Sequence, residues 1–115
     1  MAASRPLQVT QNDFDQIVLA DPMPVVVEFY APWCGHCRRL APTIDEVTRE
    51  FDGRMRVVQV NADENRDLVH RFHLTGVPTI IIFANGQEVD RFVGALPIET
   101  IEAHMNEALA RVPQR

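Results

Sequence analysis

The stretch APWCGHC, residues 31–37, contains the only two cysteines of the chain, Cys34 and Cys37. Gly35 and His36 separate them. Three kinds of chemistry use this spacing: a metal site, a structural disulfide, and a pair of thiols that exchanges electrons with other disulfides. Each makes different demands on the rest of the sequence, so the surrounding residues discriminate between them.

The size and composition of the chain limit what it can be. Its 115 residues, 46% of them hydrophobic, suit one domain over residues 1–115 with a core from about 7 to 110. There are 16 acidic residues, and all 11 basic residues are arginine, which gives a formal net charge of −5. Because phosphate binding needs a basic patch, we expect no nucleic-acid partner.

The sequence also argues against membrane contact. No apolar run approaches the roughly 20 residues that cross a bilayer. The longest, residues 25–27 and 80–83, have the length of strands. The N-terminal segment MAASRPLQVTQNDFD has a single arginine and no apolar core, so it does not resemble a signal peptide. We therefore expect a cytoplasmic protein in a reducing environment.

Apolar runs typical of strands alternate with helical patterns along the chain. The expected strands are 7–9, 24–31, 55–63 and a hairpin over 79–93 that turns at Asn85-Gly86. The expected helices are 11–19 with Thr10 as N-cap, 35–51 with Pro42 inside it, 65–74 opened by Asp63 or Asn65, and 97–110. This order predicts an α/β fold, a mixed central sheet with helices on both faces.

Metal binding and a structural disulfide explain the cysteine pair poorly. A closed zinc site needs four protein ligands, and one C-x-x-C supplies two. His36 lies inside the short loop, while His70, His73 and His104 show no paired spacing and fit exposed helix positions or helix ends. A disulfide across four residues contributes only about 2 kcal/mol by loop entropy. We therefore expect no metal and no purely structural disulfide.

A redox pair gains more from the same spacing. The short separation brings the thiols together, and the helix that follows offers its positive end to the first sulfur. Cys34 lies where strand gives way to helix, so we expect it to be the nucleophile. Cys37, one turn into the helix, is expected to be more buried, to keep its proton longer and to act as the resolving thiol.

The motifs WCGHC after an apolar strand, GVPT before a second strand, and NG and VG beyond it resemble the thioredoxin family from about residue 7 to 109. The resemblance implies the thioredoxin fold, a Cys34–Cys37 disulfide in the oxidised form, and a cis peptide before Pro78. It also implies that Val77 lies beside Cys34 with backbone groups free to pair with an extended substrate. A shallow, mostly apolar substrate surface is expected from Trp33, Pro32, Gly76, Val77, Pro78, Gly94 and Ala95.

Glu28 stands in VVVEFY, where every neighbour is apolar and a buried charge is costly, so its pKa should be raised. By resemblance it matches a buried acid that accepts the proton of Cys37, through water, when Cys37 attacks the mixed disulfide. The alternative is a carboxylate that reaches solvent or a local partner. Gln59 replaces a lysine that many relatives carry, and the loss of that cation should raise the pKa of Glu28 further.

Two features make opposite predictions about whether the protein oxidises or reduces disulfides in the cell. His36 makes the pair resemble the CGHC site of protein disulfide isomerases, which implies a stabilised dithiol and a stronger oxidant. Ala95 resembles thioredoxins instead, since isomerases carry an arginine there, and Arg91 is expected to face solvent. We predict a protein-disulfide reductase. The alternatives are an isomerase-like oxidase and, in a different class, a redox-inert binding or chaperone module.

The predicted reaction is two successive thiolate transfers. Cys34 attacks a substrate disulfide, and Cys37 then attacks Cys34 and releases the reduced substrate. No cofactor is expected in the protein itself. The expected partners are disulfide-containing proteins and, by resemblance, a thioredoxin reductase-like electron donor that reduces the Cys34–Cys37 disulfide again. We expect the protein to be a monomer.

Overall fold

One mixed sheet organises the part of the chain that the computed structural model describes, residues 5–112. Its strand order is β1-β3-β2-β4-β5. The strands are β1 (Leu7–Gln8), β2 (Val25–Tyr30), β3 (Arg56–Asn61), β4 (Thr79–Ala84) and β5 (Gln87–Val93). The central strand β2 runs parallel to β3 and antiparallel to β4. The interpretation of the N-terminus as unlike a signal peptide rests partly on residues 1–4, which lie outside the described residues.

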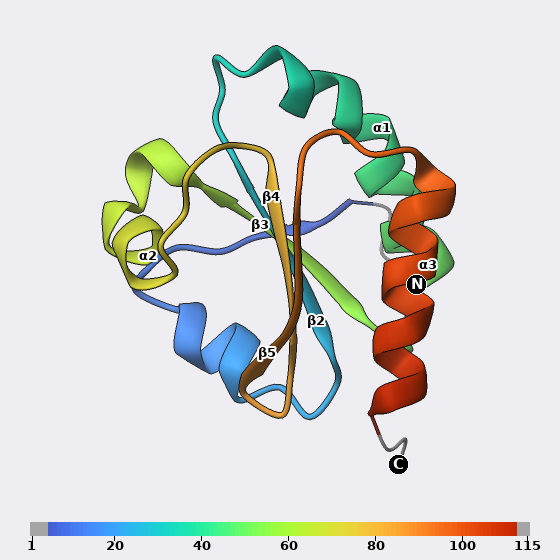
Figure 1. The fold of residues 1–115 in the computed structure, drawn as a ribbon. Coiled ribbons are helices and arrows are strands. Elements are labelled where there is room, and N and C mark those ends of the chain that lie inside the picture. Colours follow the sequence, from blue (N-terminus) through green and yellow to red (C-terminus); the bar gives the residue numbers. More distant parts are fainter. Residues whose placement is uncertain (1–4, 113–115) are drawn as a thin grey trace.

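Helices cover both faces of this sheet, as the sequence predicts. They are α1 (Gly35–Glu50), α2 (Arg66–Arg71) and α3 (Ile98–Arg111), with the short segments η1 (Asp15–Leu19) and η2 (Ala62–Glu64). Figure 1 shows α1 and α3 on one face and α2 with η1 on the other, and the two main apolar clusters follow this division. Within residues 5–112, no helix is long and apolar enough to cross a membrane.

The alternating pleat of β2 decides which face each of its side chains enters. Val25, Val27 and Phe29 pack into the cluster on the α2 face, while Val26 belongs to the cluster on the α1 face. Glu28, two positions after Val26, therefore also faces α1. The strand that builds the core thus also carries one carboxylate into it.

The hairpin between β4 and β5 turns at Asn85 and Gly86, as predicted, with φ of 52° and 80°. Both residues adopt the left-handed conformation that a two-residue hairpin requires. The expectation that Arg91 on β5 faces solvent is confirmed in part, since 31% of its side-chain surface is accessible. Its guanidinium makes two bonds to Glu88, of 2.7 and 2.8 Å, and a third of 2.7 Å to the carbonyl of Phe72.

The first predicted helix is shorter than expected. Residues 11–13 form a turn, and the helical segment η1 begins only at Asp15. Thr10 Oγ1 accepts the N–H of Asn12 at 3.3 Å, and Asp13 Oδ1 accepts the N–H of Thr10 at 2.8 Å. These are the reciprocal side-chain bonds of a helix start, and they satisfy N–H groups that have no partner inside a helix. Thr10 therefore caps the first turn, as predicted, and a three-residue turn precedes η1.

The three histidines outside the cysteine motif differ in environment. His70 is exposed in the last turn of α2, and His73 is exposed just beyond it, as expected. His104 is neither exposed nor at a helix end. It is half-buried on α3, with Nδ1 2.7 Å from Asp90 Oδ2 and its ring stacked on Phe92 at a centroid distance of 4.2 Å.

Candidate active site

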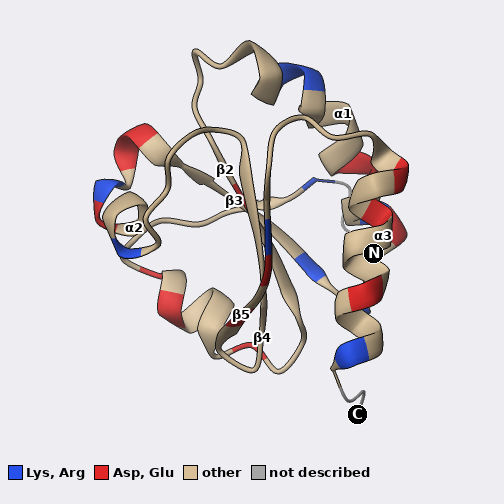
Figure 2. Cartoon of the chain, viewed as in Figure 1, with Lys and Arg blue, Asp and Glu red and all other residues tan. Residues whose placement is uncertain are grey.

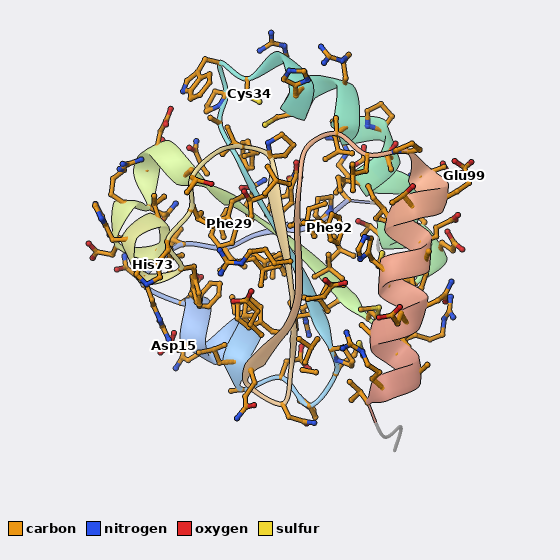
Figure 3. The ribbon with its side chains drawn as sticks, viewed as in Figure 1. Asp15, Phe29, Cys34, His73, Phe92 and Glu99 are labelled. Carbon is orange, nitrogen blue, oxygen red and sulfur yellow. The ribbon has the colours of Figure 1, made fainter. Side chains whose placement is uncertain are left out.

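Cys34 lies at the junction of two elements, where the chain leaves β2 and enters α1. It is the N-cap of α1, and its Sγ accepts the N–H of Cys37 at 3.1 Å. The Cys34 thiol in turn donates to the carbonyl of Val77 at 3.8 Å. The positive end of the helix dipole therefore faces Cys34 Sγ, and a sulfur in this position is favoured as a thiolate. Figure 3 shows Cys34 at one end of the molecule, where α1 begins.

The two cysteines do not differ in burial, contrary to the prediction. Both thiols are free, and the residues are 4% and 5% exposed. They form a small apolar cluster with Ala31, and Val77 packs against it, so Cys34 is covered as completely as Cys37. What distinguishes them is their surroundings, since Cys37 alone lines a pocket together with Glu28.

That pocket connects the second thiol to the buried acid. It has a volume of about 210 Å³ and is lined by Glu28, Tyr30, Ala31, Pro32, Cys37, Arg38, Ala41 and Gln59. A water molecule occupies roughly 30 Å³ in the liquid, so the pocket has room for more than one. The carboxyl group and the thiol therefore share a space through which a proton can pass.

Glu28 is 1% exposed, and its carboxyl group has one strong partner. Gln59 Nε2 donates to Glu28 Oε1 at 2.7 Å. Burial raises the pKa of Glu28 from 4.5 to about 7, a rise that the bond from Gln59 opposes and the negative charge of Asp45 supports. The acid is therefore close to half-ionised at neutral pH, as a group that takes up and returns a proton should be.

The pKa of Cys37 moves in the direction that makes unassisted ionisation rare. Burial, the contact with Cys34 and the charge of Glu28 raise it from 9.0 to about 12. A thiol with such a pKa is almost entirely protonated at neutral pH. It needs a neighbouring base before it can act as a nucleophile.

The residues predicted to contact substrate fall into two adjoining groups. Trp33, Gly76 and Val77 line one pocket of about 250 Å³. Trp33 is 68% exposed, and its indole N–H donates to Asp63 at 2.8 Å, which fixes the ring over this pocket. Its other lining residues are Ala31, Ala62, Asp63, Arg66, Val69, Leu74 and Thr75.

The second group surrounds Pro78. The Val77–Pro78 peptide is cis, and the carbonyl of Pro78 accepts the N–H of Gly94 at 2.9 Å. This bond brings Gly94 and the exposed Ala95 beside the proline. Pro78 itself is buried, so it shapes the predicted surface from below instead of forming part of it.

His36 is exposed in the first turn of α1, and its Nδ1 contacts the guanidinium of Arg39. A guanidinium only donates, so Nδ1 is the acceptor. Among the hydrogen bonds of residues 5–112, none joins His36 to Cys34. Figure 2 shows basic residues at the start of α1 and acidic ones along α3. Arg38 and Arg39 therefore place positive charge near Cys34 in an acidic protein.

Several contributors to the site were missed by sequence reasoning. Gln8 bonds to Gln59, Asp63 holds Trp33, and Arg39 holds His36. Gln8 could have been found only with the register of β1 against β3, which no local pattern supplies. Over the described range 5–112, no three His, Cys, Asp or Glu side chains gather in a way that could hold a metal ion.

Comparison with known proteins identifies relatives of the chain. The family model described as Thioredoxin matches residues 5–107. The chain is 44% identical over 102 residues to Thioredoxin 1 of Nostoc sp., covering 85% of this chain and 95% of that protein. It is 40% identical over 102 residues to Thioredoxin of Synechocystis sp., covering 89% and 95%. With Thioredoxin 1 of Synechococcus elongatus, the identity is 42% over 101 residues, covering 88% and 94%.

The buried acid predicts a specific dependence of stability on pH. Its pKa is 4.5 when unfolded and about 7 when folded, so the folded protein binds more protons between these values. The free energy of unfolding should therefore fall as the pH rises through this window. Glu28→Gln lacks the titrating group and should not show this fall. Between pH 5 and pH 8, the free energy of unfolding of wild type should therefore fall by on the order of 3 kcal/mol more than that of Glu28→Gln.

Urea unfolding of the reduced proteins at both pH values measures this difference. Glu46→Gln, which removes an exposed carboxylate from α1, serves as the matched control and should follow wild type. The same pH dependence in wild type and Glu28→Gln would show that the carboxyl group of Glu28 titrates normally.

Proposed function

The chain belongs to the thioredoxin family and is a thiol-disulfide oxidoreductase that reduces protein disulfides, and from this premise we propose how its residues divide the reaction. Cys34 is the nucleophile, Cys37 is the resolving thiol and Glu28 is the proton acceptor. The observation that supports this division most strongly is the shared pocket of Glu28 and Cys37. The isomerase-type alternative is not favoured, since the relatives reported above are thioredoxins.

The first step uses Cys34 as a thiolate. It attacks one sulfur of the substrate disulfide and forms a mixed disulfide, while the other substrate sulfur leaves as a thiolate and takes up a proton. In the second step Cys37 attacks Cys34 Sγ. The Cys34–Cys37 bond forms, the mixed disulfide breaks and the second substrate sulfur leaves. The substrate gains two electrons, and the protein becomes the oxidised disulfide.

The second step requires the Cys37 proton to leave first. With its pKa raised to about 12, the thiol ionises too rarely for efficient attack at neutral pH. Glu28, with a pKa of about 7, is a base of suitable strength on the same pocket. The proton passes from Cys37 to Glu28 through pocket water, and it returns to solvent after the exchange.

The substrate lies as an extended peptide across the two groups of contact residues. The carbonyl of Val77, which the Cys34 thiol contacts at 3.8 Å, pairs with a substrate N–H once Cys34 has reacted. Trp33 and Gly76 contact the peptide on one side of Cys34. Gly94 and Ala95 contact it on the other, above the buried Pro78. Backbone pairing favours extended segments without requiring a particular sequence.

The reaction needs a source of electrons and a reducing setting. A thioredoxin reductase-like partner returns two electrons to the Cys34–Cys37 disulfide after each turnover. The chain works as a monomer and as a single domain over residues 1–115, with the cytoplasm as its compartment. These assignments extend the family's chemistry to this chain.

His36 adjusts the balance between the oxidised and reduced forms. Its ring lies in the first turn of α1, two residues after Cys34, where a polar N–H near the sulfur favours the thiolate. The contact with Arg39 holds the ring through Nδ1 and leaves Nε2 to carry the ring proton. The effect of His36 is therefore on the reduction potential, while the steps of the reaction are carried by Cys34, Cys37 and Glu28.

Serine replacements separate the two thiols. Cys34→Ser keeps an oxygen at the N-cap position of α1, so it should fold, and it should lose at least about 1,000-fold in turnover because the nucleophile is gone. Cys37→Ser should instead accumulate a mixed disulfide through Cys34. Intact mass spectrometry after mixing with a single-disulfide protein measures the adduct. Substantial turnover by Cys34→Ser would contradict the assignment.

Replacing the histidine tests its effect on the potential. Pro is tolerated in the first turn of a helix, so His36→Pro should fold. The reduction potential against glutathione should become more negative by about 30 mV, or about 1.4 kcal/mol, because a group that favours the dithiol is lost. Arg39→Gln, which keeps the imidazole, is the control and should shift the potential less. No change in His36→Pro would exclude the proposed tuning.

A further inference from the structure

Three polar side chains stand in one row across neighbouring strands. Gln8 on β1 is paired in register with Gln59 on β3, and Gln59 is paired with Glu28 on β2. Neighbouring strands lie about 4.8 Å apart, and paired residues point to the same face. The row therefore lies on the face that α1 covers, and it begins at the exposed edge strand and ends at the buried acid.

Hydrogen bonds join the residues of the row into a continuous chain, and Tyr30 of β2 extends this chain at the Gln8 end. The Tyr30 hydroxyl donates to Gln8 Oε1 at 3.0 Å, and Gln8 Nε2 donates to Gln59 Oε1 at 2.8 Å. Gln59 Nε2 then donates to Glu28 Oε1 at 2.7 Å. Every bond in the chain donates toward Glu28.

The direction of this chain has a chemical meaning. A side-chain amide that presents its N–H to a carboxyl group stabilises the carboxylate, while one that presents its carbonyl accepts from the protonated acid and stabilises that form. Gln59 can present either group when it is alone. With Gln8 Nε2 directed at it, a reversed Gln59 would place two NH₂ groups against each other. Gln8 therefore favours the orientation in which Gln59 donates to Glu28.

We propose that Gln8 is a positioning residue for disulfide exchange, which acts through Gln59, with Tyr30 at the far end, to favour the carboxylate form of Glu28. The proposal rests on the proposed function, in which that carboxylate accepts the Cys37 proton. It assigns to a neutral chain of amides the task of keeping the acid able to accept a proton. No charged partner of Glu28 is needed for this.

The other groups around Glu28 leave this task to the chain. On α1, Asp45 disfavours the carboxylate by its charge, Cys37 is the proton donor, and Arg38 lines the same pocket. On the β4 side, the residue paired with Glu28 is Ile80, which has no titratable group. Burial raises the pKa of Tyr30, so its hydroxyl keeps the proton that it donates to Gln8 throughout the neutral range.

Gln8→Met tests the proposal, because it keeps the length of the side chain and removes both of its hydrogen bonds. The carboxyl ¹³C resonance of Glu28, identified by its loss in Glu28→Gln, is followed from pH 5 to pH 9 in the reduced protein. We expect the titration midpoint to rise by about half a pH unit in Gln8→Met and by about one in Gln59→Met, which loses the direct bond. Tyr30→Phe should produce a smaller rise in the same direction.

The double variant decides whether Gln8 acts through Gln59. Gln8→Met combined with Gln59→Met should shift the midpoint no further than Gln59→Met alone, because the path from Gln8 is already broken. Leu7→Met, an exposed change on the neighbouring β1 residue and the opposite face, should leave the midpoint at its wild-type value. Additive shifts, or no shift in Gln8→Met, would overturn the proposal.

The rate of mixed-disulfide resolution separates this proposal from the one on which it rests. In Gln8→Met the pH at which the rate reaches half its maximum should rise with the midpoint of Glu28. If Gln8→Met leaves both values unchanged while Glu28→Gln still slows resolution, the amide chain has no role and Glu28 remains the acceptor. If Glu28→Gln resolves at the wild-type rate, the proposed function itself fails.

Discussion

The burial of two ionisable groups on one small pocket is the constraint on which the rest of the structure depends. Glu28 and Cys37 both lose the solvation that would stabilise their charged forms, and the pKa of each rises for that reason above all others. Neither can readily carry charge while the other does. In the proposed reaction, a proton that leaves the thiol has an acceptor on the same pocket, and the negative charge moves between the two groups without being added to the interior.

The fold produces this pair from two simple periodicities. Alternation along β2 sends Glu28 toward α1, between apolar residues that face the opposite way. The helix that follows begins at Gly35, so Cys34 lies at its N-cap and Cys37 one turn inside. Cys34 thus meets the positive end of α1 and the backbone of Val77, while Cys37 shares a pocket with the carboxyl group of Glu28. The chemical difference between two identical residues comes from their positions on one helix.

The sequence was sufficient for what depends on local patterns and on resemblance. The central apolar strand, the helix after the cysteines and the Asn85-Gly86 turn all follow from periodicity and turn preferences, and the structure confirms them. What the sequence did not reveal depends on contacts between distant segments. The bond between Trp33 and Asp63, the bond from Arg91 to Phe72 and the pairing of Gln8 with Gln59 each join residues more than fifteen positions apart. The start of the first helix was predicted too early, since residues 11–13 form a turn before η1, although Thr10 and Asp13 make the side-chain bonds of a helix start.

Rapid-quench measurement of the resolving step tests the central claim most directly. A mixed disulfide is formed on Cys34, and the rate at which Cys37 releases the substrate is followed from pH 5 to pH 9. The account predicts a rate in wild type that rises through an inflection near pH 7, the pKa of Glu28, and a slower rate without that inflection in Glu28→Gln. The same profile in both proteins would show that Cys37 loses its proton by another route, and the role assigned to Glu28 would be wrong.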